Sequence, residues 1–145
     1  MRKVSKNLQE TNKIAKLFVD KILSAKKAGA LVVGLSGDLG AGKTAFTKAV
    51  AKYLGVKSKV DSPTFVIMKK YPLKKQKHKA LLHFDAYRLE DEKELLNLGW
   101  QEIVSNKDFF IIIEWPENVK KVLPKDVQYI YFSHHEGDSR ILELK

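Results

Sequence analysis

The longest apolar stretches of the chain are residues 30–36 (ALVVGLS) and 109–115 (FFIIIEW). A strand that is covered on both faces has such a continuous apolar run, so both stretches predict buried strands. Residues 64–71 and 80–87 also have strand character, and the polar, basic run 72–79 (PLKKQKHK) separates them. This arrangement predicts a β-hairpin with an exposed basic loop.

A second hairpin is predicted near the C-terminus, where the sequences YIYF and ILEL flank the polar stretch SHHEGDSR. Before it, the stretch PENVKKVLP forms at most a short helix, because Pro124 ends it.

Three segments have helical periodicity, with apolar residues three or four positions apart. The first helix ends before Gly29, the second begins near Gly42 and is closed by Gly55, and the third follows the acidic run EDEKE. The residues that mark these helices are, in turn, Ile14, Leu17, Phe18, Ile22 and Ala25; Phe46, Ala49, Val50, Tyr53 and Leu54; and Leu95, Leu96, Trp100, Ile103 and Val104.

The predicted elements therefore follow the order helix, strand, loop, helix, hairpin, helix, strand, hairpin. Two strands buried on both faces and flanked by helices indicate a parallel core with helices on both faces, to which the hairpins add antiparallel strands. We predict an α/β fold with a mixed β-sheet. A length of 145 residues with 44% apolar residues fits one domain that spans residues 1–145.

The formal net charge of the chain is +10, with 27 basic residues. A basic surface can bind nucleic acid. Only Arg2, Arg88 and Arg140 are arginine, however, the residue favoured for bidentate phosphate and base contacts. Lysines that keep the surface soluble are the simpler explanation, and weak attraction to RNA is compatible with both.

The chain contains no Cys, which excludes disulfides and thiolate metal sites. Residues 1–10 lack the apolar run of a signal peptide, and no apolar run is long enough to span a bilayer. We therefore expect a cytoplasmic protein without a membrane partner.

A glycine-rich stretch, GDLGAGKT, follows the first buried strand directly and precedes a predicted helix. It matches the P-loop pattern G-x-x-x-x-G-K-[ST] through Gly37, Gly42, Lys43 and Thr44. Glycines let backbone N–H groups wrap a polyphosphate, and the N-terminus of the next helix attracts the anion. Lys43 can reach the β- and γ-phosphates, and the Thr44 hydroxyl can bind Mg²⁺. Chance glycines would lack this context, so we predict a P-loop NTPase-like fold.

Two acids are candidates for the metal and for the hydrolysis step. Glu114 ends a core strand, where a P-loop protein needs an acid near its metal; the alternative is a strand-end glutamate that faces water. Asp85 lies in an otherwise apolar strand, so its carboxylate must be paired or bound. It can reach Mg²⁺ through water, orient the attacking water, or pair with Arg88. His83 is predicted to be structural, because no second histidine lies at ligand spacing.

Residues 61–65 (DSPTF) form a loop that opens a strand. Pro63 favours extended geometry at Ser62, and the hydroxyls of Ser62 and Thr64 can sense a γ-phosphate as a switch loop does. Ordinary turn chemistry is the alternative. Trp115 is predicted to belong to the core, with a lid over the nucleotide or a partner contact as alternatives.

Four motifs occur in one order along the chain: GDLGAGKT, SPTF, HFDAYRL and EWPE. Together they resemble the TsaE family (also called YjeE) over most of the chain. The resemblance implies a small ATPase that uses ATP and Mg²⁺ and supports the synthesis of threonylcarbamoyladenosine in tRNA. It also implies binding to a complex of TsaB and TsaD, and hydrolysis that is weak alone and activated by these partners.

The resemblance also implies roles for single residues. Lys43 and Glu114 would act in catalysis, and Asp85 would assist hydrolysis. Thr44 and Glu114 would hold Mg²⁺, with Asp85 near it. The nucleotide would contact the P-loop and three more distant positions: Thr11, Gly37, Asp38, Leu39, Gly40, Ala41, Gly42, Lys43, Thr44, Ala45, Thr64 and Gly137. Many family members have a second Thr where this chain has Ala45, so a hydroxyl near the α-phosphate is missing here while the backbone N–H is kept.

Two other functions fit parts of the sequence. A nucleoside or nucleotide kinase would need a second substrate site and usually a lid that bears arginines, but the chain has three arginines and no lid-sized insertion. A basic RNA-binding module with a structural nucleotide site would use KKQKHK as its patch, but no aromatic-rich RNA-binding signature accompanies it.

Overall fold

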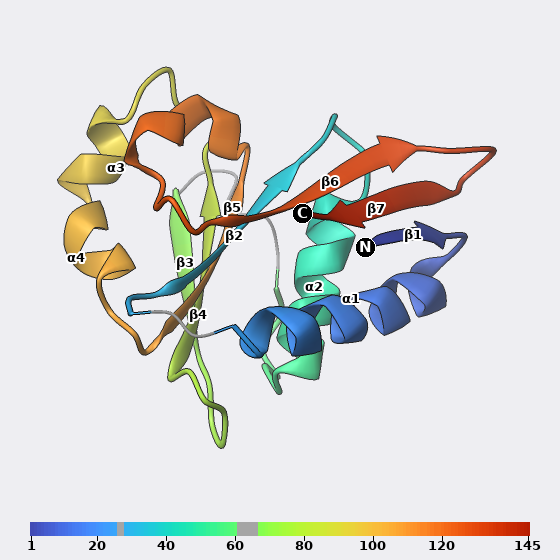
Figure 1. The fold of residues 1–145 in the computed structure, drawn as a ribbon, viewed down its shortest axis with the longest axis horizontal. Helices are drawn as coiled ribbons and strands as arrows, with labels where there is room; N and C mark the ends of the chain where they lie inside the picture. The colour runs from blue at the N-terminus through green and yellow to red at the C-terminus, as the bar shows by residue number, and fades with distance from the viewer. Residues whose placement is uncertain (26–27, 61–66) are drawn as a thin grey trace.

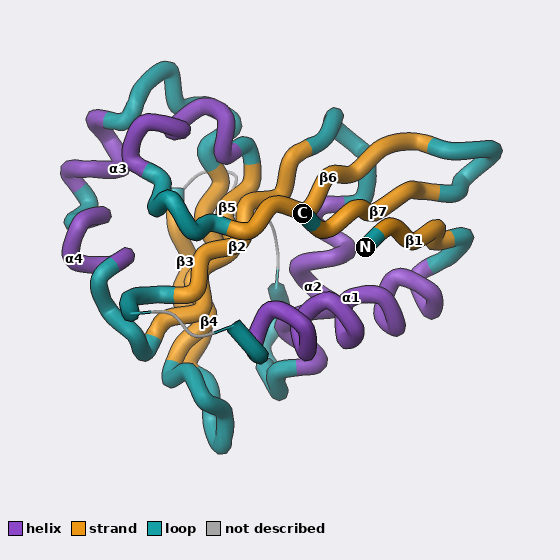
Figure 2. Tube along the Cα trace, viewed as in Figure 1, coloured by secondary structure: helices purple, strands orange, loops and turns teal. Residues whose placement is uncertain are grey.

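The computed structural model describes residues 1–25, 28–60 and 67–145. Among these residues, seven strands form one sheet in the order β1-β7-β6-β2-β5-β4-β3 (Figures 1 and 2). The strands are β1 (Arg2–Ser5), β2 (Leu31–Ser36), β3 (Met68–Pro72), β4 (Ala80–Asp85), β5 (Phe109–Glu114), β6 (Gln128–His134) and β7 (Arg140–Leu144). The helices are α1 (Leu8–Leu23), α2 (Lys43–Tyr53), α3 (Lys93–Asn97), α4 (Trp100–Val104) and the 3₁₀ helix η1 (Pro116–Val122).

The sheet is parallel at its centre and antiparallel at both sides, which confirms the predicted mixed sheet. β2 runs parallel to β5 and β6, and β4 runs parallel to β5. The two predicted hairpins are present as β3–β4 and β6–β7, and β1 adds an antiparallel strand beside β7. Because parallel strands end at the same edge of a sheet, β2, β4 and β5 bring their C-terminal residues to one side of the molecule.

Helices cover both faces of the sheet, as predicted, and a hydrophobic core lies on each face (Figure 1). Side chains alternate between the two faces along each strand, so neighbouring strand residues enter different cores. α1 and α2 pack on one face, where Phe18 and Phe46 meet Ile112. The other face is covered by α3, α4 and η1, and Trp100 packs there against Phe84.

None of the helices formed by the described residues has the length and apolar character that crossing a bilayer demands.

The third predicted helix is wrong in one respect, because the chain forms two short helices there instead of one. α3 and α4 are separated at Gly99, whose φ of 86° is a left-handed conformation that interrupts a helix. Leu95 and Trp100 are buried as the helical pattern predicted, whereas Leu96 is exposed. The predicted residues of the second short helix, Trp100, Ile103 and Val104, still pack on the sheet core.

The buried stripes of α1 and α2 contain partly different residues from those that the sequence pattern predicted. Leu17 and Tyr53 were expected to face the core, but both side chains are exposed. The Tyr53 hydroxyl instead donates a hydrogen bond to Asp20 across the two helices, at 2.6 Å. α1 meets the sheet through Ala15 and Val19, which the pattern had not included.

Strand β1 was not predicted, and two strand boundaries differ from the expectation. β1 is polar and only its last residue, Ser5, is buried; it joins the sheet through backbone pairing with β7. β4 ends at Asp85, two residues before the predicted end. The strand predicted at residues 64–71 corresponds to β3, which begins at Met68. Residues 61–66 lie outside the described part of the chain.

The loop between β3 and β4 is exposed and basic, as predicted. His78 is the exception, because its ring is buried edge-on against Phe110, with 5.7 Å between ring centroids. The loop precedes the start of β4 and therefore lies at the sheet edge opposite the ends of β2, β4 and β5. β3 is the edge strand of the described sheet, and lysines on an edge strand discourage pairing with another chain.

We predict that Trp100 is a main stabilising side chain of the core under α3, α4 and η1. It is fully buried, and its indole N–H donates to the Val122 carbonyl at 2.9 Å. Trp100→Ala should lower the free energy of unfolding by about 3–5 kcal/mol, measured by urea denaturation. The exposed Leu96→Ala should change it by less than about 0.5 kcal/mol. Equal stability of the two variants would contradict this assignment.

Candidate functional site

The glycine-rich loop connects the end of β2 to the start of α2 in a conformation that needs its glycines. Gly37, Gly40 and Gly42 have φ values of 155°, 76° and 104°, in the range that side chains rarely adopt. A Cβ atom at Gly37 would lie 2.6 Å from the backbone oxygen of Phe132 in β6. The loop therefore passes too close to the sheet for any other residue at position 37.

α2 begins at Lys43, so its first turn adjoins the loop directly. The first N–H groups of a helix have no carbonyl partner within the helix, and the positive end of the helix dipole lies there. In α2 the first hydrogen bond between an N–H group and the carbonyl four residues earlier runs from Phe46 to Gly42, at 3.0 Å. The amides of residues 43–45 and the half-buried Thr44 thus lie at an anion-binding helix terminus.

Lys43 folds back into the loop from which its helix starts. Its ammonium group donates a hydrogen bond to the Gly37 carbonyl and lies 3.7 Å from the centre of the Trp115 ring. Burial lowers the pKa of this ammonium below its ordinary value. Four carboxylates raise it and so oppose this shift; in order of effect they are Glu114, Glu117, Asp85 and Asp38.

Glu114 and Asp85 end neighbouring parallel strands and lie opposite one another in the strand register. By the alternation along β4 and β5, both belong to the face that α1 and α2 cover. Glu114 is only 4% exposed, and His83 Nε2 lies 2.7 Å from its Oε2 atom. The alternative of a water-facing glutamate is therefore wrong, and His83 proves to contact a predicted site residue.

Asp85 accepts a hydrogen bond from the Tyr87 backbone N–H at 3.0 Å, in the turn that ends β4. This bond orients the carboxylate at the strand end and is compatible with either role predicted for it.

Three of the predicted nucleotide contacts, Thr11, Gly137 and Thr64, belong to other parts of the chain than the glycine-rich loop. The Thr11 hydroxyl lies 2.6 Å from that of Ser5, and the latter also donates to the Asn7 carbonyl. Gly137 is exposed in the turn between β6 and β7. Thr64 belongs to residues 61–66, outside the described part of the chain.

Sequence reasoning missed Arg140, which joins the C-terminal hairpin to the glycine-rich loop. One guanidinium nitrogen donates to the Gly40 carbonyl at 3.2 Å, and the other donates to the Asp138 and Ser139 carbonyls. The only available signal was the scarcity of arginine, since this contact spans 100 positions of the chain.

Trp115 was assigned to the core by default, but it is half-buried beside Lys43 and adopts φ 58°. Its ring also packs on Tyr87, with 5.1 Å between ring centroids. A bulky residue rarely adopts this left-handed conformation. The ring lies against the ammonium group and also packs against the core under α3, α4 and η1. Glu117, two residues further on, was also missed as a neighbour of Lys43.

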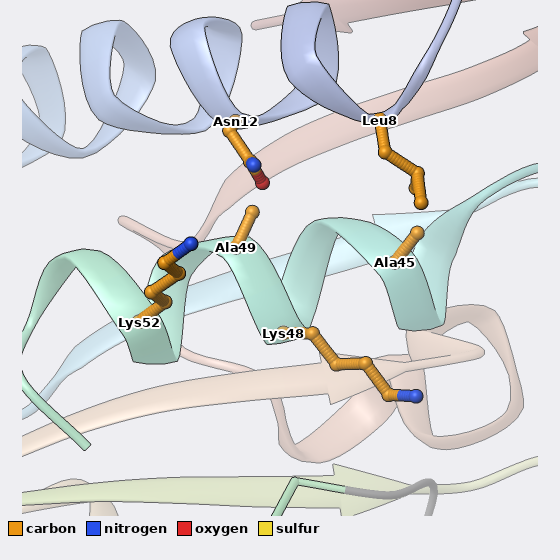
Figure 3. A pocket seen from close by; sticks show the side chains of 6 residues that line it. All are labelled: Leu8, Asn12, Ala45, Lys48, Ala49 and Lys52. Carbon is orange, nitrogen blue, oxygen red and sulfur yellow. The ribbon is translucent and has the colours of Figure 1, made fainter. Parts of the chain in front are cut away.

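A pocket of about 300 Å³ opens between α1 and α2 next to the first turn of α2 (Figure 3). In it, Leu8 and Asn12 point from α1 toward Ala45 and Ala49 of α2. Lys48 and Lys52 complete the lining. Ala45 therefore presents a methyl group to this pocket.

Comparison with known proteins agrees with the motifs. The family model described as "Threonylcarbamoyl adenosine biosynthesis protein TsaE" matches residues 5–142. The chain belongs to the TsaE family.

Curated relatives named "tRNA threonylcarbamoyladenosine biosynthesis protein TsaE" support this assignment. The protein of Bacillus subtilis is 39% identical over 134 residues, covering 92% of this chain and 78% of the relative. That of Haemophilus influenzae is 33% identical over 132 residues, covering 91% and 80%. The crystal structure of YdiB from Bacillus subtilis matches with a TM-score of 0.73 at 30% identity, covering 98% of this chain and 82% of that one.

The residues of this TsaE-family chain fit a nucleotide with Mg²⁺. The loop offers amides and an ammonium group to phosphates, and Thr44 with Glu114 offers oxygen donors of the kind that Mg²⁺ prefers. Among the described residues no group of three or more His, Asp or Glu side chains could hold a metal alone. Mg²⁺ commonly binds through one or two protein oxygens together with phosphates and water.

We predict that Lys43 destabilises the folded protein when no nucleotide is bound. Its folded-state pKa lies below its ordinary value, so the folded chain binds this proton less tightly than the unfolded chain. The resulting destabilisation is present at neutral pH and is relieved as the pH rises through the folded-state pKa toward about 10.4. Lys43→Met should therefore leave the melting temperature at pH 7 unchanged or raised, and its advantage should shrink at alkaline pH. The exposed Lys48→Met is the control, and a clear loss of stability in Lys43→Met would contradict the prediction.

Proposed function

We propose that this protein binds ATP with Mg²⁺ and hydrolyses it slowly in support of tRNA threonylcarbamoyladenosine modification. We further propose that it acts in the cytoplasm and that its partner is a TsaB–TsaD complex. The observation that carries the proposal is the glycine-rich loop around the Lys43 ammonium, with the buried Glu114 carboxylate at the end of the neighbouring strand. Membership of the TsaE family supplies the pathway.

Binding of the phosphates is the role of the loop and the first turn of α2. Lys43 would exchange the Gly37 carbonyl for β- and γ-phosphate oxygens, which compensate a buried ammonium better than a neutral carbonyl. The amides of residues 40–45 would donate to the same phosphates. Ala45 keeps its backbone N–H, so we expect binding without the hydroxyl that many relatives have.

Thr44 and Glu114 are the residues that would hold Mg²⁺, which neutralises charge on the phosphates when it is bound. Asp85 lies beside Glu114 in the register and would orient the attacking water or accept its proton. Glu114 and Asp85 would thus have different roles, and their contacts differ as well. A histidine ring contacts Glu114, whereas a backbone amide donates to Asp85.

Two of the three arginines support slow hydrolysis by the isolated chain. Arg140 is engaged by three backbone carbonyls, and Arg2 lies in β1 at the sheet edge. An arginine directed at the γ-phosphate is worth roughly 10³–10⁵ in rate. A partner that supplies or orders such a group would accelerate the reaction strongly.

The basic β3–β4 loop does not favour the RNA-binding alternative. It lies at the opposite edge of the sheet from the glycine-rich loop. Any tRNA contact through it would be weak and dependent on salt.

We predict that the two acids have separable effects. Glu114→Gln should weaken the Mg²⁺-dependent binding of a non-hydrolysable ATP analogue by about 10-fold or more. Asp85→Asn should leave this binding unchanged and lower hydrolysis by about 100-fold or more. Calorimetric titration and a phosphate-release assay measure these effects. Wild-type hydrolysis by Asp85→Asn would leave Asp85 with a structural role alone.

We also predict strong activation by TsaB–TsaD. Phosphate release by the purified chain should be very slow and should rise steeply when both partners are added. Lys43→Met, which cannot hold the γ-phosphate, should show no such rise. Brisk hydrolysis without any response to the partners would instead support a free-standing ATPase or a kinase.

A further inference from the structure

We propose that His83 is a positioning residue that holds the Glu114 carboxylate in the orientation required for Mg²⁺. This inference rests on the proposed ATP- and Mg²⁺-binding function. It assigns a role to a histidine that the sequence pattern alone marked as structural.

His83 and Glu114 lie on neighbouring strands and on the same face of the sheet. In the register, His83 lies opposite Ile112 and Asp85 lies opposite Glu114, so His83 and Glu114 are diagonal neighbours. The imidazole is fully buried, and its Nε2 atom lies 2.7 Å from Glu114 Oε2. Both side chains are thus held inside the packed core and cannot exchange this contact for water.

The acceptor character of the carboxylate identifies the donor of this bond. Within the described part of the chain, His83 Nδ1 is buried and has no hydrogen-bond partner. An ionised carboxylate can only accept, so Nε2 carries the hydrogen and donates it to Oε2. The bond engages one carboxylate oxygen, which leaves the carboxylate able to meet a metal without breaking it.

A purely structural role explains this arrangement poorly. On this face of the sheet the neighbours of His83 include the buried apolar residues Leu81 and Ile112, so an apolar residue at position 83 would pack there without leaving a buried nitrogen unsatisfied. A carboxylate that ligates a metal, by contrast, needs a fixed orientation, and the partners of such ligands commonly change metal affinity 10–100-fold (roughly) when mutated. The geometry thus favours orientation of Glu114 over stability as the purpose of His83.

The test is a Mg²⁺ titration of the full chain with a non-hydrolysable ATP analogue. The affinity for the analogue is first measured in EDTA. Mg²⁺ is then added in excess of the EDTA, and the Mg²⁺ concentration that gives half of the full increase in affinity is determined. His83→Leu should raise that Mg²⁺ concentration about 10-fold or more, while affinity in EDTA stays as in the wild type. His83→Gln, which keeps an N–H donor at a similar reach, should restore most of the response. Melting temperatures without ligand report stability separately.

His78→Leu is the matched control, because His78 is also a buried histidine but lies at the opposite sheet edge. It should leave the Mg²⁺ response unchanged. A wild-type response in His83→Leu, or an equal loss in His83→Leu and His83→Gln, would overturn the positioning role while the proposed function stands. A wild-type protein that binds the analogue without any effect of Mg²⁺ would overturn the proposed function itself.

If His83→Leu does not fold, His83→Gln and His83→Asn decide instead. Only the longer Gln side chain should preserve the response, and equal behaviour of the two would overturn the role.

Discussion

A buried ammonium group is the constraint around which this protein is organised. Lys43 is 5% exposed, and a charge removed from water must be compensated by hydrogen bonds and opposite charge. Its compensation comes from the end of β2 through Gly37, and from the stretch after β5 through Trp115. Carboxylates at the ends of β4 and β5 add to it. Only parallel strands that end at one edge can supply all of these groups together, so the order of the central strands and the site depend on each other.

The parts of the fold that sequence reasoning predicted correctly are those with a local physical cause. The strands β2 and β5 have continuous apolar runs because both of their faces are covered, and the loop after β2 has glycines because its backbone adopts positive φ. Gly99 shows the limit, because a single glycine inside a helical pattern does not reveal that it will interrupt the helix. β1 has no apolar pattern, since backbone pairing with β7 holds it.

The candidate site shows the same division between local and distant causes. Lys43, Thr44, Asp85 and Glu114 could be named because a motif or a strand end marks them. The contacts that complete the site are long-range: His83 reaches Glu114 from another strand, and Arg140 reaches Gly40 from the far end of the chain. Trp115 follows Glu114 directly, but an apolar ring at the end of an apolar strand is most simply assigned to the core. Its left-handed backbone, which directs the ring to Lys43, has no signature in the sequence.

These contacts also connect the C-terminal hairpin to the glycine-rich loop. Arg140 joins the β6–β7 turn to the Gly40 carbonyl, while β7 pairs with β1, whose Ser5 hydroxyl contacts Thr11 in α1. α1 in turn packs along α2 and lines the pocket that Ala45 enters (Figure 3). The loop is thereby held from two sides, by the hairpin at Gly40 and by the helix pair at Ala45. The methyl group of Ala45 faces Leu8 across this pocket. Under the proposed function, the amides that would meet the phosphates are therefore positioned by these backbone supports of the loop.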